Sequence, residues 1–229
     1  MARPADPNAK EALVACARAE FARRGLVGAR IEDITAACDL SKGAFYLHFH
    51  SKEALFGELV DAFLAGLNEC GERRDHDTAE FLTEYGAVSR RDLEERTSRY
   101  HKFLEMETAE DLQVLEHMWA YRDVVGVLLR GAQGTKFEGA IWEITDREVD
   151  RIKENFNRSQ GEHACRTDIP PEIFGSLIVG TYVLLGMRMS RMTEKPDLAE
   201  WARSLHTLIR EGSVPMDQNP EARLARSTQ

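Results

Sequence analysis

The sequence lacks the residue patterns on which most enzymes and metalloproteins depend. It contains no HExxH motif, no CxxC pair and no phosphate-binding loop, and its seven histidines are scattered. Glu105, Glu107 and Glu110 are spaced like the surface of a helix rather than like a pair of catalytic carboxylates. We therefore predict that the protein is not an enzyme and has no catalytic residues, no metal site and no cofactor.

Cysteine is also scarce. The four cysteines, Cys16, Cys38, Cys70 and Cys165, have no histidine at metal-ligand spacing. Free cysteine is commonly a small buried hydrophobic residue, and we interpret all four in this way. A redox switch is the alternative, with Cys38 as its best candidate because this residue falls between two predicted helices. Its position on an apolar face favours simple packing.

Long apolar runs and strand-like alternation are missing as well. The longest uncharged run, residues 173–187, is shorter than the roughly 18 apolar residues that a bilayer requires. No apolar stretch follows a basic start, so we expect no secretory signal, a cytoplasmic location and no membrane partner. With 229 residues, 43% of them hydrophobic, the chain can bury a substantial core. Helical periodicity without repeats predicts an all-α fold.

The net charge of −9 is unevenly distributed. Residues 1–55 contain eight Lys or Arg and seven Asp or Glu, whereas the remainder contains 22 and 32. The acidity therefore belongs to the C-terminal part, and a nonspecific nucleic-acid coat is not expected. Any nucleic-acid contact must come from a local group of basic and polar residues in the N-terminal part.

The most informative segment is residues 41–55, SKGAFYLHFHSKEAL. Phe45 and Phe49 are four residues apart and would share the buried face of a short helix. Ser41 can accept hydrogen bonds from the first-turn amides, and Ser51 can do the same for a second helix that begins at Lys52. A lysine at that position is unfavourable for the helix dipole, which weakens a purely structural explanation and suits a nearby phosphate.

Upstream residues complete the unit. Asp6 and Pro7 open a helix in which Leu13, Ala17 and Phe21 repeat every four residues and which ends near residue 25. A shorter helix is predicted over residues 31–38, separated from the Ser41 cap by only two residues. Two short helices joined by so tight a turn form a helix-turn-helix, whose second helix enters the major groove of DNA.

Residues 7–67 resemble the DNA-binding domain of the TetR family of bacterial transcriptional regulators, with the helix-turn-helix at about 30–49. The resemblance implies that Ser41, Tyr46, His48 and Lys52 contact phosphates and that Lys42, Gly43 and Ala44 lie nearest the base edges. It rests on a run of residues in family order and spacing: Phe21, Gly25, Ile34, Thr35, Ser41, Lys42, Gly43, Phe45, Tyr46, His48, Phe49, Ser51, Lys52, Glu53 and Leu55.

Two departures from the family pattern concern DNA recognition. The family often has two threonines before the second helix, where this chain has Ala29 and Arg30. We therefore expect an arginine contact from Arg30, to phosphate or to a guanine, in place of a hydroxyl contact. Asp39 replaces the frequent turn glycine, and aspartate tolerates the left-handed conformation that the turn needs.

The rest of the chain, residues 68–216, is predicted to form a helical domain for ligand binding and dimerisation, followed by a flexible tail at 217–229. The apolar stripe after Lys52 predicts a helix long enough to link the two domains. We expect a polar break at 71–77, then helices at 78–85, 91–106, 110–129 and 137–159, with a glycine-rich turn at 131–134.

Two further helices are predicted near the C-terminus. Pro170 and Pro171 open one that runs to about residue 192, and Asp197 with Glu200 caps another that ends at Gly212. The pair resembles the helices through which the TetR family dimerises, with an intramolecular core as the alternative. The residues expected at the dimer interface are Phe174, Leu177, Ile178, Thr181, Leu184, Leu185, Trp201, Leu205 and Leu208.

Residues 100–145 contain many large adaptable side chains, in the region where the family has its ligand pocket. A small-molecule site needs an apolar cavity with a few polar groups. The alternative is a filled core, because aromatic and methionine stripes are common in both. The residues that we expect to line a pocket are Phe103, Met106, His117, Met118, Tyr121 and Trp142.

Taken together, these features predict a homodimeric, sequence-specific DNA-binding regulator, most simply a repressor released from operator DNA by a small-molecule effector. A ligand that favours another arrangement of the middle helices would tilt the linking helix and spoil the spacing of the two contact helices. The alternative is a DNA-binding regulator without small-molecule control, whose helical body serves protein partners.

Overall fold

The computed structural model describes residues 7–161 and 166–213, and its regular structure there is entirely helical. The predicted all-α fold is confirmed. The predicted Asp6 cap, Cys165 and the tail at 217–229 lie outside the described residues. In order, the helices are α1 (Pro7–Gly28), α2 (Ile31–Ala37), α3 (Lys42–His48), α4 (Lys52–Tyr85), α5 (Arg90–Glu94), α6 (Ser98–Ala120), α7 (Arg122–Arg130), α8 (Ala140–Gly161), α9 (Pro171–Met189) and α10 (Leu198–Ser213).

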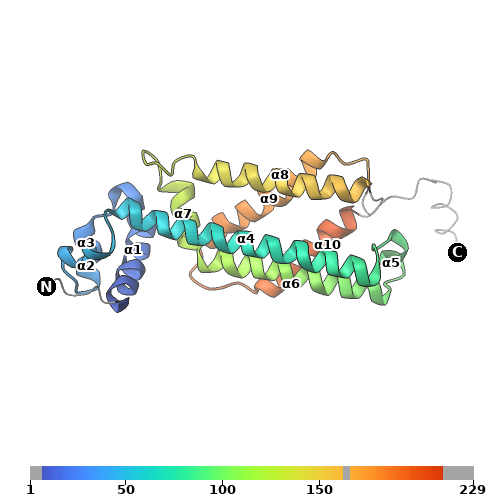
Figure 1. Cartoon of the computed structure of the whole chain (residues 1–229), viewed down its shortest axis with the longest axis horizontal. Coiled ribbons are helices and arrows are strands. Elements are labelled where there is room, and N and C mark those ends of the chain that lie inside the picture. Colours follow the sequence, from blue (N-terminus) through green and yellow to red (C-terminus); the bar gives the residue numbers. More distant parts are fainter. Residues whose placement is uncertain (1–6, 162–165, 214–229) are drawn as a thin grey trace.

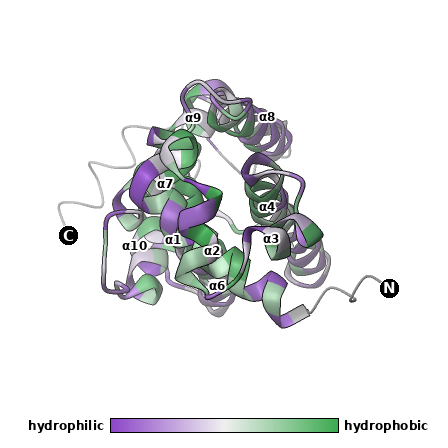
Figure 2. Ribbon diagram, turned by 90° about the vertical axis from the view of Figure 1, so that its left-hand side faces the viewer, coloured by the Kyte–Doolittle hydropathy of each residue, from purple (hydrophilic) through white to green (hydrophobic). Residues whose placement is uncertain are grey.

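The helices form an elongated molecule with a small N-terminal unit, α1 to α3, at one end (Figure 1). Helix α4 starts in this unit and continues along the body, which comprises α5 to α10. Along the body, α8 and α9 lie on one side and α6 and α10 on the other (Figure 2). With 34 residues, α4 is about 50 Å long, so it links both parts as predicted.

The N-terminal unit is built as its sequence predicts. Phe45 and Phe49 are 0% and 2% exposed and pack in a core shared with α1, α2 and α4. Ser41 Oγ accepts a hydrogen bond from the Ala44 amide at 3.1 Å, which confirms the cap. Asp39 has a φ of 53°, so the turn keeps the left-handed conformation without a glycine.

Helix α1 meets the body at a contact between two glycines. Gly25 has a φ of 70°, which interrupts the helix near the predicted end. The next amide, that of Leu26, donates to the Gly131 carbonyl at 2.9 Å. A Cβ atom on Gly131 would lie 2.9 Å from Gly25 Cα, so neither residue has room for a side chain. Arg18 adds a two-pronged ion pair, with Nε and Nη2 on the Asp123 carboxylate at 2.7 and 2.6 Å.

Several helix boundaries differ from the prediction. The break expected at 71–77 is wrong, because α4 continues through it to Tyr85. Its polar residues there mostly face solvent, while Phe81 is buried against Phe103 on α6. The helix expected at 91–106 is divided instead, because Arg96 adopts a φ of 49° and Thr97 caps a new helix.

Two more expectations about the middle of the chain are wrong. Helix α6 passes without interruption through the gap expected between residues 106 and 110, and it ends at Ala120. Tyr121 then separates α6 from α7, so that the predicted helix at 110–129 is two elements. The bend lets five consecutive residues of α7, Val124 to Leu128, become buried.

The C-terminal helices are close to the prediction. Asp197 Oδ1 accepts a hydrogen bond from the Glu200 amide at 2.9 Å, at the start of α10. Helix α10 includes Gly212 and α9 stops at Met189, three residues early. In the part of the chain that the structure describes, α9 alone is long and apolar enough to cross a membrane; this is weak support for a span, since core helices of soluble proteins pass the same test. Here α9 packs along α8.

The glycine contact yields a prediction about stability. Gly131→Ala should lower the thermal unfolding midpoint and cost about 1–3 kcal/mol, because the added methyl group meets backbone that has no side chain to move aside. Gly161→Ala is the matched control, since nothing lies within 4 Å of a Cβ there, and it should change stability by less than about 0.5 kcal/mol. Equal unfolding midpoints for the two variants would contradict the contact.

Candidate functional site

The outer face of α3 is the first candidate site. Ser41, Lys42 and Gly43 are exposed there, and Tyr46 is 49% exposed. Ala44 and His48 are half-buried. Arg30, exposed at the start of α2, joins Lys42, Tyr46 and Lys52 around one shallow hollow. The structure therefore brings together the residues that the sequence singles out, on a surface that projects from the N-terminal unit.

Leu47 belongs to the same surface and was missed by the sequence analysis. It is 62% exposed on α3 although its side chain is large and apolar. The signal was available, because Leu47 stands four residues after Gly43 and three after Ala44 and must share their helical face. This face of α3 is thus apolar and smooth, with cationic groups beside it.

The lysines of this surface are fixed in different ways. Lys42 Nζ lies 2.6 Å from Glu32 on α2, and this hydrogen bond raises the pKa of Lys42 and lowers that of Glu32. Lys52 Nζ donates to the carbonyls of Val27 and Ala29 at 2.9 and 2.7 Å. The lysine at the start of α4 therefore has a structural explanation: it holds the C-terminal end of α1 against α4.

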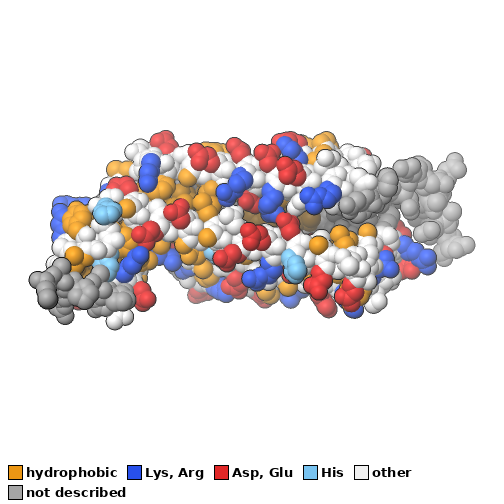
Figure 3. Space-filling view, viewed as in Figure 1, with side chains coloured by type: hydrophobic (Ala, Val, Ile, Leu, Met, Phe, Trp, Pro, Cys, Tyr) orange, Lys and Arg blue, Asp and Glu red, His pale blue; other side chains and the backbone are white. Residues whose placement is uncertain are grey.

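The second candidate site is a cavity of about 120 Å³ inside the body. It lies between α4, α6, α7, α8 and α9, and its wall is mostly aliphatic. In Figure 3, hydrophobic side chains are visible between the charged surfaces of α4 and α8. The lining residues are Phe63, Leu67, Cys70, Gly71, Arg74, Val114, Met118, Val125, Leu129, Ile141, Ile144, Thr145, Glu148, Arg151, Ile152, Ile178, Val179, Tyr182 and Val183.

Of the six residues predicted to line a pocket, Met118 does so. Phe103 and Met106 pack in a separate cluster with Phe81. Trp142 is 71% exposed on α8 and lies outside the cavity wall. His117 and Tyr121 stand behind the wall, where the His117 ring stacks on Phe63 with centroids 5.5 Å apart.

The cavity could have been anticipated in part from α8. Ile141, Ile144, Glu148 and Ile152 recur at helical spacing and form one stripe along the helix. The contribution of α4 was hidden by the break expected at residues 71–77, since Gly71 and Arg74 lie inside it.

A buried ionic network stands beside the cavity. Arg74 on α4 pairs with Glu110 and Asp111 on α6, at 3.2 and 2.5 Å. The Tyr182 hydroxyl on α9 donates to Asp111 at 2.8 Å, and His206 on α10 lies 3.2 Å from Glu107. Four helices therefore meet in one polar cluster.

Burial has opposite outcomes at the two neighbouring acids. It raises the pKa of Glu110 to about 8, because the charge of Arg74 does not offset the loss of hydration. Burial also pushes the pKa of Asp111 upward, but the contacts with His206, Arg74 and Tyr182 outweigh it and bring the pKa below its usual value. Asp111 is the ionised member of the pair near neutral pH.

The third candidate site is the outer face of α9 and α10. Leu177 and Leu184 are 62% and 59% exposed, and Leu208 on α10 is 71% exposed. Ile173, which the sequence analysis did not include, continues the same stripe. Among the other residues predicted for the dimer interface, Thr181 is half-buried, Leu185, Trp201 and Leu205 pack partly against the core, Ile178 lines the cavity, and Phe174 stacks on Phe156.

The remaining metal-binding and redox candidates are weak. His76, Asp77 and Glu80 could offer three ligand atoms within 4.8 Å of one another, but two of these residues are exposed on α4. Cys16, Cys38 and Cys70 are free and half-buried. Burial raises the pKa of the Cys38 and Cys70 thiols, which leaves little reactive thiolate.

The N-terminal unit matches known proteins in sequence. Residues 13–59 match the family model for bacterial regulatory proteins of the tetR family. Over 47 residues the chain is 47% identical to the HTH-type transcriptional repressor DhaR of Mycobacterium sp. (strain GP1). This match covers 20% of this chain and 24% of DhaR. The chain thus matches about a quarter of this relative's length. The prediction of a regulator rather than an enzyme agrees with these matches.

Solved structures match the fold of nearly the whole chain. The TetR family regulator PfmR from Thermus thermophilus has a TM-score of 0.61 at 21% identity and covers 87% of this chain and 97% of its own. FadR from Bacillus subtilis, solved in complex with stearoyl-CoA, has a TM-score of 0.57 at 15% identity, with 88% and 98% covered. Residues 13–59 therefore match the tetR family of bacterial regulatory proteins, and the chain shares the fold of these solved structures.

Proposed function

We propose that the protein is a sequence-specific DNA-binding transcriptional regulator, active in the cytoplasm as a homodimer, and that it represses until a small molecule releases it from its operator. The observation that carries the proposal is the exposed face of α3, which is flanked by Arg30, Lys42 and Lys52. An α-helix of this kind fits the major groove. DhaR, a relative of this domain, is named a repressor.

The apolar stripe of α9 and α10 supports a dimer. Exposed leucines on α9 and α10 are unfavourable in water unless a second surface covers them. A second copy of the chain would present the same stripe, as a two-fold interface requires. Dimerisation would also supply the second α3, because two helices about 34 Å apart read adjacent turns of the major groove.

Control by a small molecule is supported by the position of the cavity. Phe63 and Leu67 of α4, together with Val125 and Leu129 of α7, line it. Helix α4 holds the N-terminal unit through Lys52, and α7 holds it through the contacts of Gly131 and Asp123. A ligand that changes the separation of α4 and α7 would therefore move α3. FadR, a neighbour in fold, was solved with stearoyl-CoA bound.

The size of the cavity favours a second candidate, a regulator without small-molecule control. Ligand sites commonly have volumes of roughly 300–1,000 Å³, whereas this cavity has about 120 Å³. The helical body would then serve protein partners. The two candidates share DNA binding and differ in whether a cavity ligand changes the affinity for DNA.

Selection from a random duplex pool, followed by titration of the selected duplex, tests the proposal and separates two roles of lysine. Lys42→Met should weaken duplex binding and make it less salt-dependent while leaving the unfolding midpoint unchanged, because Lys42 is exposed. Lys52→Met should also lower the midpoint, by an amount equivalent to about 1–3 kcal/mol, because two backbone carbonyls lose a charged donor. Failure to select any duplex would refute the proposed function.

Leu47 should read thymine methyl groups. Leu47→Ala is expected to weaken binding of the selected duplex roughly fourfold, the effect of one buried methyl group, about 0.8 kcal/mol. Replacing the contacted thymine by uracil should weaken wild-type binding equally and leave the variant unaffected. Leu82→Ala, at an exposed leucine near the far end of α4, is the control. Independent, additive losses from the protein and DNA changes would contradict the contact.

The raised pKa of Glu110 predicts a pH dependence of stability. The folded protein keeps a proton on Glu110, which faces Arg74, Asp77, Glu107 and Asp111, up to a pKa of about 8, whereas the ordinary value is 4.5. Its contribution to stability is therefore complete below pH 4.5 and is lost as the pH rises through 8.

Glu110→Gln should remove this contribution to the pH dependence. The variant should gain stability relative to the wild type as the pH rises from 5 to 8.5, measured by thermal unfolding. The control is Glu154→Gln, at an exposed glutamate of α8, which should leave the profile as it is. A wild-type profile in the Glu110 variant would show that this residue is ionised throughout.

A further inference from the structure

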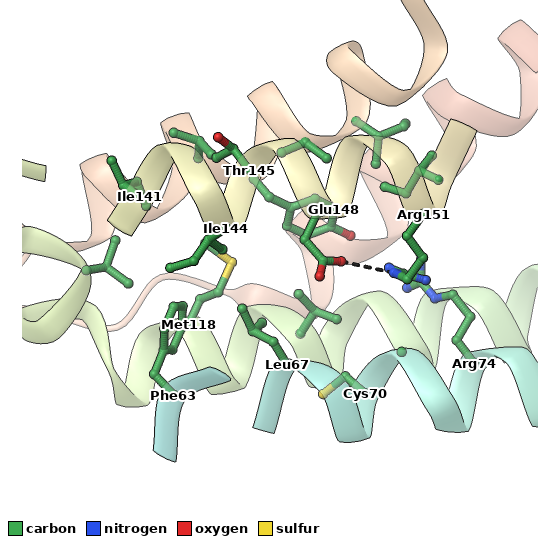
Figure 4. A pocket seen from close by; sticks show the side chains of 18 of the residues that line it. Phe63, Leu67, Cys70, Arg74, Met118, Ile141, Ile144, Thr145, Glu148 and Arg151 are labelled. Carbon is green, nitrogen blue, oxygen red and sulfur yellow. Dashed lines mark hydrogen bonds and ion pairs between the residues drawn. The ribbon is translucent and has the colours of Figure 1, made fainter. Parts of the chain in front are cut away.

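The cavity has charged groups at one end only. Figure 4 shows Arg74, Glu148 and Arg151 together at that end, while Phe63, Met118 and Ile144 lie toward the other. Such an arrangement suits an elongated ligand with an apolar chain and a single polar head. The charges at the polar end therefore decide which head the cavity accepts.

At this end of the cavity, Arg151 has hydrogen-bond donors that no described residue accepts. Its Nε donates to Glu148 at 3.0 Å, and among the described residues its two terminal nitrogens have no hydrogen-bond partner. The guanidinium reaches across to α4, where a Cβ on Gly71 would lie 3.7 Å from both Cζ and Nη1. Because glycine leaves this surface of α4 bare, the planar group can lie against the helix and keep its terminal edge free.

Arg74 differs from Arg151 in this respect. Its Nη2 donates to Asp111 and its Nε lies 3.2 Å from Glu110, so it belongs to the buried network. Among the described lining residues, Glu148 is the one with a carboxylate. It forms ion pairs with Arg151 and with Arg147, whose Nε lies 3.7 Å away. A cationic head would face two guanidinium groups with no free carboxylate, whereas an anionic head would find an unoccupied donor pair.

We propose that the cavity binds a molecule with a short to medium apolar chain and one carboxylate head, which accepts hydrogen bonds from the terminal nitrogens of Arg151. A guanidinium offers a carboxylate two parallel hydrogen bonds, and this charge-assisted pairing is stronger than a hydrogen bond between neutral groups. This inference rests on the proposed function in that it treats the cavity as the effector site. The head would lie between α8 and α4, beside Gly71 of the helix that begins at Lys52.

Three probes with the same chain test the head: octanoate, 1-octanol and octylamine, each titrated into the full chain by calorimetry or ligand-observed NMR. Octanoate should bind at least tenfold more tightly than octanol, because a charged hydrogen-bonded pair is worth that factor. Octylamine should bind most weakly.

Arg151→Gln should reduce octanoate affinity to that of octanol and leave octanol affinity unchanged, which also shows that the cavity is intact. Arg147→Gln, one turn earlier on α8 and outside the cavity wall, is the matched control and should keep the preference for octanoate. Equal affinities for the three heads, no binding of any probe, or the same loss in both variants would overturn the proposal.

The selected duplex separates this inference from the proposed function. Octanoate that binds through Arg151 and lowers duplex affinity supports both. Octanoate that binds through Arg151 without changing duplex affinity supports the ligand class and refutes release by an effector. Duplex binding in a protein that takes none of the probes refutes the ligand class alone.

Discussion

The contact between α1 and α7 determines how the N-terminal unit sits on the body. Two glycine backbones are in contact there, and the Leu26 amide donates a hydrogen bond to the Gly131 carbonyl. Arg18 forms an ion pair with Asp123 nearby. Backbone atoms cannot adjust as side chains do, so α1 follows any displacement of α7. Lys52 holds the C-terminal end of α1 to the start of α4 through its hydrogen bonds to the Val27 and Ala29 carbonyls. The orientation of α3 is therefore fixed from two directions, by α4 and by α7, which both line the cavity.

The buried network joins the remaining helices. Ion pairs in a protein interior often add little stability, because dehydration cancels much of their attraction. Their geometric demands are strict, and Asp111 meets Arg74, Tyr182 and His206 from three other helices. The network thus fixes the relative positions of α4, α6, α9 and α10. It links the wall of the cavity to the helices whose outer face carries the apolar stripe.

The sequence predicted the N-terminal unit well because its signals are local. Phe45 and Phe49 share a helical face, Ser41 caps the helix that follows it, and Asp39 turns the chain, all within a few residues. The same reasoning failed at residues 71–77, where a glycine and several polar residues looked like a loop. Burial of Phe81 against α6, which no local pattern reveals, keeps α4 helical there.

The cavity was the least predictable part because five helices far apart in sequence create it. Aromatic and methionine residues at 100–145 predicted a pocket there, yet Phe103 packs elsewhere and Trp142 faces solvent. The aliphatic stripe of α8 was visible, but its partner surface on α4 was not. Lys52 shows the converse: its cationic character suggested a phosphate, while its backbone partners depended on where α1 ends.

The glycine contact has a consequence for the divergence of such proteins. The glycine contact and the Arg18–Asp123 ion pair involve no residue of α3 or of the cavity wall, so substitutions there leave these two contacts in place. A lineage can therefore acquire a new operator or a new ligand while inheriting the same mechanical connection between them. Gly25 and Gly131 themselves are the exception, since any side chain at either position would separate the two surfaces.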